Sequence, residues 1–491
     1  MPTSPSEPAA PTADVVVVGA GPAGLAAATA AGARGARVAL VDAGTAPGGQ
    51  YWRHPATARL GSVDPPGVDE DALARLHHGL KDYRRLLDLL ERQVGAGTTR
   101  YLSQHHAWAV EQYGETFTVH AIDRSGPTER TVPVTGHRLV LAPGAYDRQV
   151  PFPGWTLPGV LTAGGAQALL KGNGVAAGSR VVVAGTGPFL LPVAAGLATA
   201  GADVVGVHEA SMARAWLRHS GAVLRNANKL GEGLGYATTL ARHRVPVRSR
   251  SVLVAAHGTD RLEAVTVARA TADGTVPGSE QRLDCDTLAV GWGFTPQLEL
   301  PLELGCETRI DTDGSLVCVV DDDQQTSVPG VLVAGEACGV GGAVLALVEG
   351  AIAGAAAAGV PVTDVRLRRQ RTTLASFAAA MHRAHPVPAG WTDRVTGDTV
   401  VCRCEEVTAG RLRQSVDAGA TDARAAKLTA RPGMGWCQGR VCGYATACLT
   451  SAWSGTPYRP ELAATRPVAA PVTFGTLVVR GQHESGDRAD P

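Results

Sequence analysis

The sequence predicts an α/β protein with two dinucleotide-binding-type domains on doubly wound parallel sheets, followed by a small helical domain. Two observations predict the first part. A strand, a glycine-rich turn, a helix and a second strand follow one another from residue 14, and the same order recurs from residue 179. Such an internal repeat indicates two domains of one design. The third observation is a pair of cysteine pairs, Cys402-x-Cys404 and Cys437-x4-Cys442, in a chain of 491 residues with nine cysteines.

Composition excludes several classes of protein. Lys plus Arg equals Asp plus Glu at 45 each, and no basic stripe alternates with aromatic residues, so nucleic acid is not an expected partner. The N-terminus lacks the basic and apolar regions of a secretory signal, and residues 1–12 are expected to be a disordered leader. The longest apolar run, 341–360, carries Glu349 and is rich in Ala and Gly, so we expect a core helix and no membrane span. We therefore expect a cytoplasmic protein, in which cysteines bind metal rather than form disulfides.

The first repeat has every part of a dinucleotide-binding turn. The apolar strand DVVVVG (14–19) leads into Gly19-x-Gly21-x-x-Gly24, an alanine-rich helix follows, and a second strand (36–42) ends in Asp42. The glycines allow a tight turn, close approach of a pyrophosphate and close packing of helix on strand, while the helix N-terminus attracts the phosphates. A carboxylate about twenty residues further on is placed to bind ribose hydroxyls.

Two further segments indicate FAD rather than NAD. The stretch DAGTAPGGQYW (42–52) resembles the segment after the ribose-binding acid in glutathione-reductase-type flavoproteins. The stretch 326–354 resembles the second FAD signature of that superfamily, with Gly335-Glu336 where the signature has Gly-Asp. The chain has no cysteine before Cys285, which excludes the dithiol–flavin relay of those enzymes.

The second repeat departs from the pattern. Gly185-x-Gly187 begins it, but Leu190 replaces the third glycine, which is expected to prevent close helix–strand packing. Three interpretations stay open: an NAD(P) site, a site for another adenine nucleotide, and a degenerate structural domain. Glu209 at the end of the second strand favours NAD over NADP if a nicotinamide binds.

These patterns predict the domain organisation. We expect an FAD-binding domain in two pieces (13–175 and 280–360) around an inserted second domain (176–279). A linker rich in Arg and Ala (361–395), a cysteine domain (396–455) and a C-terminal tail (456–491) follow.

The segment between the repeats, RLVLAPGAYDRQVPFPGWTLPGVLTAGGAQALLKG (138–172), resembles a stretch shared by the FAD-containing subunits of bacterial amino-acid and opine dehydrogenases. That group includes the A-type subunit of opine oxidase, the B-type subunit of hydrogen cyanide synthase and the α subunits of multimeric proline and hydroxyproline dehydrogenases. Ala142-Pro143-Gly144 departs from its usual Ala-Thr-Gly. The resemblance extends over about 13–450 and implies cofactor-binding roles for Gly19, Gly21, Pro22, Ala23, Gly24, Asp42, Gly49, Gln50, Gly144, Gly335 and Glu336.

The family also carries a C-terminal module resembling bacterioferritin-associated ferredoxin, in which two cysteine pairs bind a [2Fe-2S] cluster. Cys402, Cys404, Cys437 and Cys442 match that pattern. Zinc is the alternative, because four thiolates also make a closed structural zinc site. The other five cysteines are interpreted as small buried residues.

The resemblance implies an oxidoreductase acting on an amino acid or another CH–NH donor, as one subunit of a hetero-oligomer. Its expected partners are a D-amino-acid-oxidase-like flavoprotein, which oxidises the substrate, and a small ferredoxin-like chain. The alternative is a stand-alone NAD(P)H-dependent flavin reductase that feeds an acceptor through the cluster. His105, His106 and His208 are expected at the surface or at strand ends, and no catalytic residue is assigned.

Overall fold

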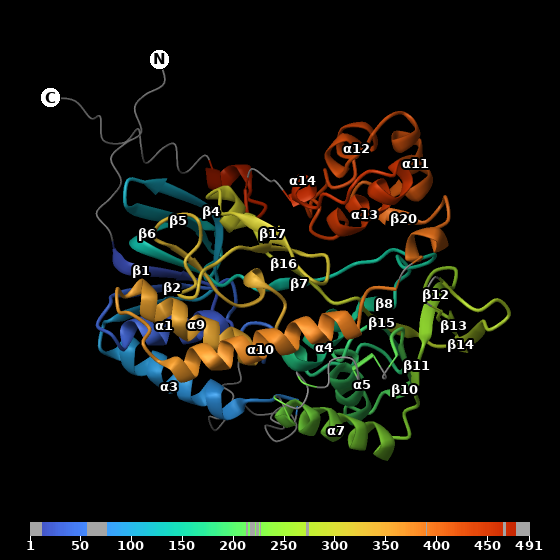
Figure 1. Ribbon diagram of the computed structural model, residues 1–491, viewed down its shortest axis with the longest axis horizontal. Helices are drawn as coiled ribbons and strands as arrows, with labels where there is room; N and C mark the ends of the chain where they lie inside the picture. Colours follow the sequence, from blue (N-terminus) through green and yellow to red (C-terminus); the bar gives the residue numbers. More distant parts are fainter. Residues whose placement is uncertain are drawn as a thin grey trace.

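The computed structural model describes residues 12–55, 76–212, 215–216, 221, 225, 227–271, 274–388, 390–464 and 468–477 (Figure 1). Most of the predicted leader and the end of the predicted tail lie outside the described residues. The first sheet has seven strands. Six of them follow the order β3-β2-β1-β6-β5-β4, and the seventh, β19, pairs with β6. Its strands are β1 (Ala13–Val18), β2 (Val38–Val41), β3 (Thr99–Leu102), β4 (His105–Tyr113), β5 (Thr116–Asp123), β6 (Arg130–Leu141) and β19 (Val331–Val333).

The first sheet is parallel around β1 and antiparallel where β4, β5 and β6 meet. Helices α1 (Pro22–Gly32) and α9 (Ala343–Ala357) pack against each other, and α3 (Leu80–Gly95) contacts α1 (Figure 1). Two glycines of α9 make this contact possible, since a Cβ on Gly350 or Gly354 would overlap the α1 carbonyls of Ala23 or Ala27. The apolar run 341–360 is thus a buried helix, and none of the described helices has the length and apolarity to cross a membrane.

The second sheet is parallel throughout, in the order β11-β10-β9-β15-β8. Helices α4, α5 and α7 accompany it, and an antiparallel sheet of β12, β13 and β14 adjoins it. These elements are β8 (Val160–Thr162), α4 (Ala163–Asn173), β9 (Arg180–Gly185), α5 (Leu190–Thr199), β10 (Asp203–Glu209), α7 (Ala227–Arg242), β11 (Val247–Ser249), β12 (Ser251–His257), β13 (Ala264–Arg269), β14 (Gln281–Asp284) and β15 (Thr287–Gly291).

The second sheet corrects the predicted boundaries of the inserted domain. Strands β8 and β15 lie outside 176–279, yet β15 pairs with both β9 and β8. The physical reason is that a short apolar strand has the same pattern in either sheet, so its partner depends on long-range packing. The chain segments that connect the two sheets contain β7 (Ala145–Asp147) and β16 (Phe294–Pro296), which pair antiparallel.

The predicted linker (361–395) contains a twenty-residue helix, α10 (Val365–Ala384). Asp364 caps it by accepting hydrogen bonds from the backbone N–H groups of Arg366 and Leu367. Figure 1 shows α10 running across the molecule from α9 toward α4. The remaining short elements before the cysteine domain are α8 (Glu299–Glu303), β17 (Thr308–Ile310), β18 (Leu316–Cys318), η2 (Gly335–Cys338) and η3 (Trp391–Arg394).

The cysteine domain is helical, as predicted, and lies at one end of the molecule (Figure 1). Its apolar core is continuous with that of the second sheet region: Leu412 and Leu449 belong to the same buried cluster as Val252. The indole Nε1 of Trp155 also donates a hydrogen bond of 2.6 Å to the carbonyl of Val400. The elements of this domain are β20 (Val400–Cys402), β21 (Val407–Thr408), α11 (Ala409–Asp417), α12 (Ala423–Ala430), α13 (Gly443–Ser454) and α14 (Glu461–Ala464).

Candidate functional site

The first glycine-rich turn is shaped by close backbone contacts. Gly19 has φ of +98°, and a Cβ there would overlap the carbonyl oxygen of Ala142. A Cβ on Gly24 would overlap the carbonyl of Gly19, and one on Gly49 would lie 2.8 Å from the Cα of Gly21. Gly21 itself meets nothing nearer than Gly49 at 4.0 Å, so its backbone stays open to a ligand. This combination fits a bound pyrophosphate.

Asp42 follows β2 at the edge of this turn. Its Oδ1 accepts a hydrogen bond from the N–H of Ala20 at 2.9 Å, and its Oδ2 accepts one from Gly44 at 3.1 Å. Burial raises the pKa of Asp42, although these two hydrogen bonds by themselves would lower it. Each carboxylate oxygen therefore retains a free lone pair, and the pair can accept bonds from ribose hydroxyls.

The third part of the site is η2 and the start of α9. Glu336 accepts hydrogen bonds from the N–H groups of Gly341 and Gly342 at 3.2 and 3.0 Å, at the N-terminal end of α9. Glu349 accepts one from Gly335 at 3.0 Å, and its Oε1 lies 3.5 Å from Nε of Arg371. Burial raises the pKa of both carboxyl groups to about 7.

We expect the flavin-free protein to lose stability as pH rises from about 4.5 to about 7. A carboxyl group whose pKa is higher in the folded state binds more protons there, so the free energy of unfolding falls through this window. Glu336→Gln should reduce that fall by roughly a third, since Glu349 and Glu303, whose pKa burial also raises to about 7, still titrate. Denaturant unfolding at pH 5, 6 and 7 measures it, with Glu307→Gln, on the exposed surface, as control. An unchanged slope in Glu336→Gln would contradict the expected titration of this group.

The second glycine-rich turn has a different electrostatic environment. Oε2 of Glu209 accepts a bond of 2.8 Å from the N–H of Gly187, and Oε1 accepts bonds from Thr186 Oγ1 and Ser211 N at 3.1 and 2.9 Å. Burial alone would raise the pKa of Glu209, but His385, with Nδ1 at 3.5 Å, and these donors outweigh it and lower the pKa. Glu209 thus has less capacity left for ribose hydroxyls than Asp42.

The C-terminal end of α10 lies beside this second turn. Trp216 donates a hydrogen bond from Nε1 to Nε2 of His385 at 2.9 Å, and its ring stacks on Phe377 at 5.5 Å. Leu190, at the position of the missing glycine, is accommodated because its neighbour in β15 is Gly291, whose Cβ would lie 3.1 Å from Cδ2 of Leu190. Close packing is therefore kept at this turn, contrary to the expectation that leucine would prevent it.

Both turns open into one cavity of about 1760 Å³ between the two sheets. A cavity for a drug-sized ligand is typically 300–1,000 Å³, so this one has room for a dinucleotide and a second molecule. The structure brings every predicted cofactor-binding residue to its wall except Gly24, which lies behind the turn. His106 also lines the cavity. His208 is buried, and its Nδ1 lies 2.7 Å from the hydroxyl of Ser251. It lies near the end of β10, as expected, but not at the surface.

The four predicted metal ligands lie together. Interaction with the thiol of Cys442 lowers the pKa of Cys402 to about 6 and that of Cys437 to about 4, and Cys404 contacts Cys437. Cys402 and Cys442 are buried, whereas Cys404 is exposed. Among the described residues, no group of three or more His, Cys, Asp or Glu is arranged to hold a metal ion.

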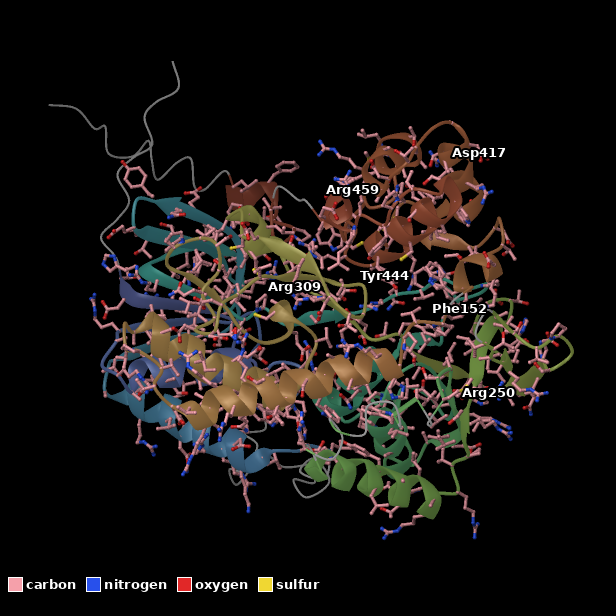
Figure 2. All side chains as sticks on the ribbon, in the orientation of Figure 1. Phe152, Arg250, Arg309, Asp417, Tyr444 and Arg459 are labelled. Carbon is pink, nitrogen blue, oxygen red and sulfur yellow. The ribbon has the colours of Figure 1, made fainter. Side chains whose placement is uncertain are left out.

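Arg148, which is buried, and Arg440, which is partly buried, connect the cysteine domain to the cavity. Arg440, inside the Cys437-x4-Cys442 loop, forms an ion pair with Glu299, with Nε 3.0 Å from Oε1, and donates a hydrogen bond of 3.2 Å to the hydroxyl of Tyr146, which lines the cavity. Arg148 and Asp313, also on the cavity wall, pair at 2.6 Å. The guanidinium of Arg148 lies 4.6 Å from the ring centroid of Tyr444 on α13, and Figure 2 shows Tyr444 where the cysteine domain meets the body of the molecule.

Two Rossmann-like parallel sheets with glycine-rich turns opening on a shared cavity define a two-domain dinucleotide-binding α/β protein. The chain belongs to the pyridine nucleotide-disulphide oxidoreductase family, whose model matches residues 13–359. The cysteine domain lies beyond that match, so the family assignment leaves its ligand open.

Curated relatives and a solved structure show which proteins the chain resembles. Hydrogen cyanide synthase subunit HcnB of Pseudomonas protegens is 35% identical over 78% of this chain and 80% of the relative. The A-type subunit of opine oxidase from Rhizobium meliloti is 34% identical over 84% of this chain and 87% of the relative. The crystal structure of L-proline dehydrogenase from P. horikoshii covers 95% of this chain and 79% of its own, with a TM-score of 0.64 and 19% identity, and supports the fold.

Four residues near the cavity had no functional assignment from the sequence: Arg148, Lys171, His385 and Arg440. Arg148 and Lys171 lie inside the 138–172 stretch, and Arg440 lies between two predicted ligands. The position of Arg440 between two cysteines predicted to bind metal was the one available signal, because a cation there would be close to their thiolates.

Proposed function

We propose that this chain is an FAD-binding, electron-transferring subunit of a hetero-oligomeric dehydrogenase acting on an amino acid or another CH–NH donor. The observation that carries the proposal is the arginine contact between the cysteine loop and the cavity wall, through Arg440 and Tyr146. Two relatives are named as subunits, of hydrogen cyanide synthase and of opine oxidase, which supports a multi-subunit assembly.

FAD would lie along the first glycine-rich turn. Gly21 and the N-terminus of α1 would face its pyrophosphate, Asp42 its ribose, and Glu336 the region of its ribityl chain. A bound flavin accepts a hydride and releases electrons singly. The chain's own residues would bind and orient it, and residues of α9 and α10 line the same cavity.

Cys402, Cys404, Cys437 and Cys442 would hold a [2Fe-2S] cluster, with zinc as the alternative. Their contacts and the lowered pKa values of Cys402 and Cys437 suit thiolate ligation by either metal. Loading requires the four side chains to turn from one another toward a common centre. The flavin in the neighbouring domain favours iron and sulfur, because a cluster provides a one-electron acceptor.

The test is a cofactor inventory of the purified chain. We expect one FAD and two iron atoms per chain, with an absorbance spectrum that shows both groups and an electron paramagnetic resonance signal after reduction. Co-expression with the neighbouring genes should recover the proposed D-amino-acid-oxidase-like subunit and a small ferredoxin-like chain. Zinc in place of iron would overturn the cluster assignment, and a colourless protein would overturn the proposed function.

The second candidate is a stand-alone NAD(P)H-dependent flavin reductase, which the Gly185 turn favours. We expect NADH to leave the flavin oxidised for minutes under anaerobic conditions, since Glu209 is occupied by Gly187, Ser211 and Thr186 and α10 lies beside the turn. Stopped-flow absorbance near 450 nm measures this, and dithionite is the positive control. Rapid bleaching by NADH that Glu209→Ala slows would support the reductase instead.

A further inference from the structure

A buried lysine lines the cavity on the side of α4. Lys171 is 6% exposed, and its ammonium group donates a hydrogen bond of 3.1 Å to the carbonyl of Tyr51 and lies 5.7 Å from the ring of Tyr51. Tyr51 directly follows Gln50, a predicted flavin-binding residue on the same cavity wall. Lys171 therefore lies beside the part of the cavity that the first glycine-rich turn opens.

The described bonding partner of the Lys171 ammonium group is a neutral group. Within the described part of the chain, no aspartate or glutamate forms an ion pair with Lys171, and its bonding partner is a neutral carbonyl. Burial lowers the pKa of this ammonium group to about 8. A buried, uncompensated charge destabilises a fold, and such groups concentrate where a ligand supplies the opposite charge.

A second cation and two aromatic rings surround the same space. Arg53 packs beside α4, since a Cβ on Gly172 would lie 3.2 Å from its Cδ, and its Nε donates a hydrogen bond of 2.9 Å to Oε1 of Gln50. Tyr51 and Tyr236 both line the cavity. Burial is the main cause that raises the pKa of both hydroxyls, and Glu232 raises it further. The wall thus combines two cations with two aromatic rings and the carboxylate of Glu232, which suits a ligand that joins an anionic group to an apolar body and also carries a positive charge.

We propose that Lys171 and Arg53 bind the carboxylate of a small organic acid, of the amino-acid or opine class, with Tyr51 and Tyr236 packing against its apolar part. This site lies in the present chain rather than in the expected partner subunit. The proposal deepens the proposed function, because it gives this chain a ligand site of its own beside the flavin position.

Calorimetric titration of the purified holoprotein with sodium benzoate tests the site, with benzamide as the neutral probe of the same shape. We expect benzoate to bind at least about tenfold more tightly than benzamide, because a charge-assisted bond is lost with the amide. Lys171→Met should weaken benzoate binding by about tenfold or more, whereas Lys171→Arg should largely restore it. The matched control is Lys81→Met, an exposed lysine on α3.

Stability separates a binding role from a structural one. Without ligand, Lys171→Met should melt at the same temperature as the wild type or higher, since it removes a buried charge. Equal affinity for benzoate and benzamide, or unchanged benzoate binding in Lys171→Met, would overturn the proposal, as would a lower melting temperature for Lys171→Met. Flavin content is read from the absorbance of the same samples, so a failure of the FAD assignment is distinguished from a failure of the carboxylate site.

Discussion

Cys437→Ala should remove the iron from the purified chain and leave its FAD in place. Cys437 contacts both Cys442 and Cys404, so its loss breaks the chain of thiols in the middle rather than at one end. Three thiolates cannot complete the two coordination spheres of a [2Fe-2S] cluster. We expect iron content to fall at least about tenfold, since loss of a ligand removes most metal affinity.

Cys285→Ala is the matched control for this prediction. Cys285 is buried, at 3% exposure, and lies in the apolar core with Leu288 and Val290 rather than with the four predicted ligands. Iron and flavin should both be retained in that variant, with a stability loss of about 1 kcal/mol for the small cavity. Metal analysis and the flavin absorbance measure the outcome. Full iron content in Cys437→Ala would show that the quartet is not the cluster site.

The elements that sequence reasoning predicted share a local cause. The Gly19 turn, the Gly335 segment and the cysteine pairs are each defined by residues close together in the chain, whose backbone or side-chain chemistry allows few alternatives. Gly19 needs its positive φ, and no residue with a Cβ fits beside Ala142. Features defined by such local chemistry can be predicted from the sequence before the fold is known.

The features that were missed depend on long-range packing. Arg148 meets Asp313 across 165 positions of sequence, and no pattern near either residue indicates that both are buried. The strands β8 and β15 are too short to specify their sheet. The C-terminal end of α10 also makes contacts with residues far away in the sequence, since Phe377 and His385 pack against Trp216. Whether a buried charge is compensated depends on the three-dimensional structure. The sequence alone therefore does not identify the arginine and lysine residues that are buried at such sites.

Arg148→Met should destabilise the protein by about 3–5 kcal/mol, as expected when one partner of a buried ion pair is removed. The side chains of Arg148 and Asp313 are 2% and 10% exposed, and the guanidinium also donates to the carbonyl of Phe294 at 2.9 Å and to the hydroxyl of Ser315. Burial alone would raise the pKa of Asp313, but Arg148 outweighs it and lowers the pKa. Without Arg148, the remaining carboxylate would be buried and uncompensated.

The exposed pair Arg309–Asp311 provides the matched control. It has a similar N–O distance of 2.7 Å, but the Arg309 side chain is 51% exposed, so Arg309→Met should change stability by less than about 1 kcal/mol. Denaturant unfolding of both variants at pH 7 measures the difference. In Arg148→Met the pKa of Asp313 should be raised, so stability should increase as pH falls toward 5, and Asp313→Asn in the same chain should remove that dependence.

Hydrogen exchange distinguishes a general loss of stability from release of the cysteine domain. Arg148 holds Tyr444 by a cation–π contact, and Tyr444 lies two residues after Cys442. We therefore expect amides of α13 to exchange faster in Arg148→Met than those of α1, which lies in a separate core. Equal acceleration in both helices would mean that Arg148 stabilises the whole fold without a particular role at this junction. Selective acceleration in α13 would identify the Arg148–Tyr444 contact as the point where the cysteine domain is anchored to the cavity wall.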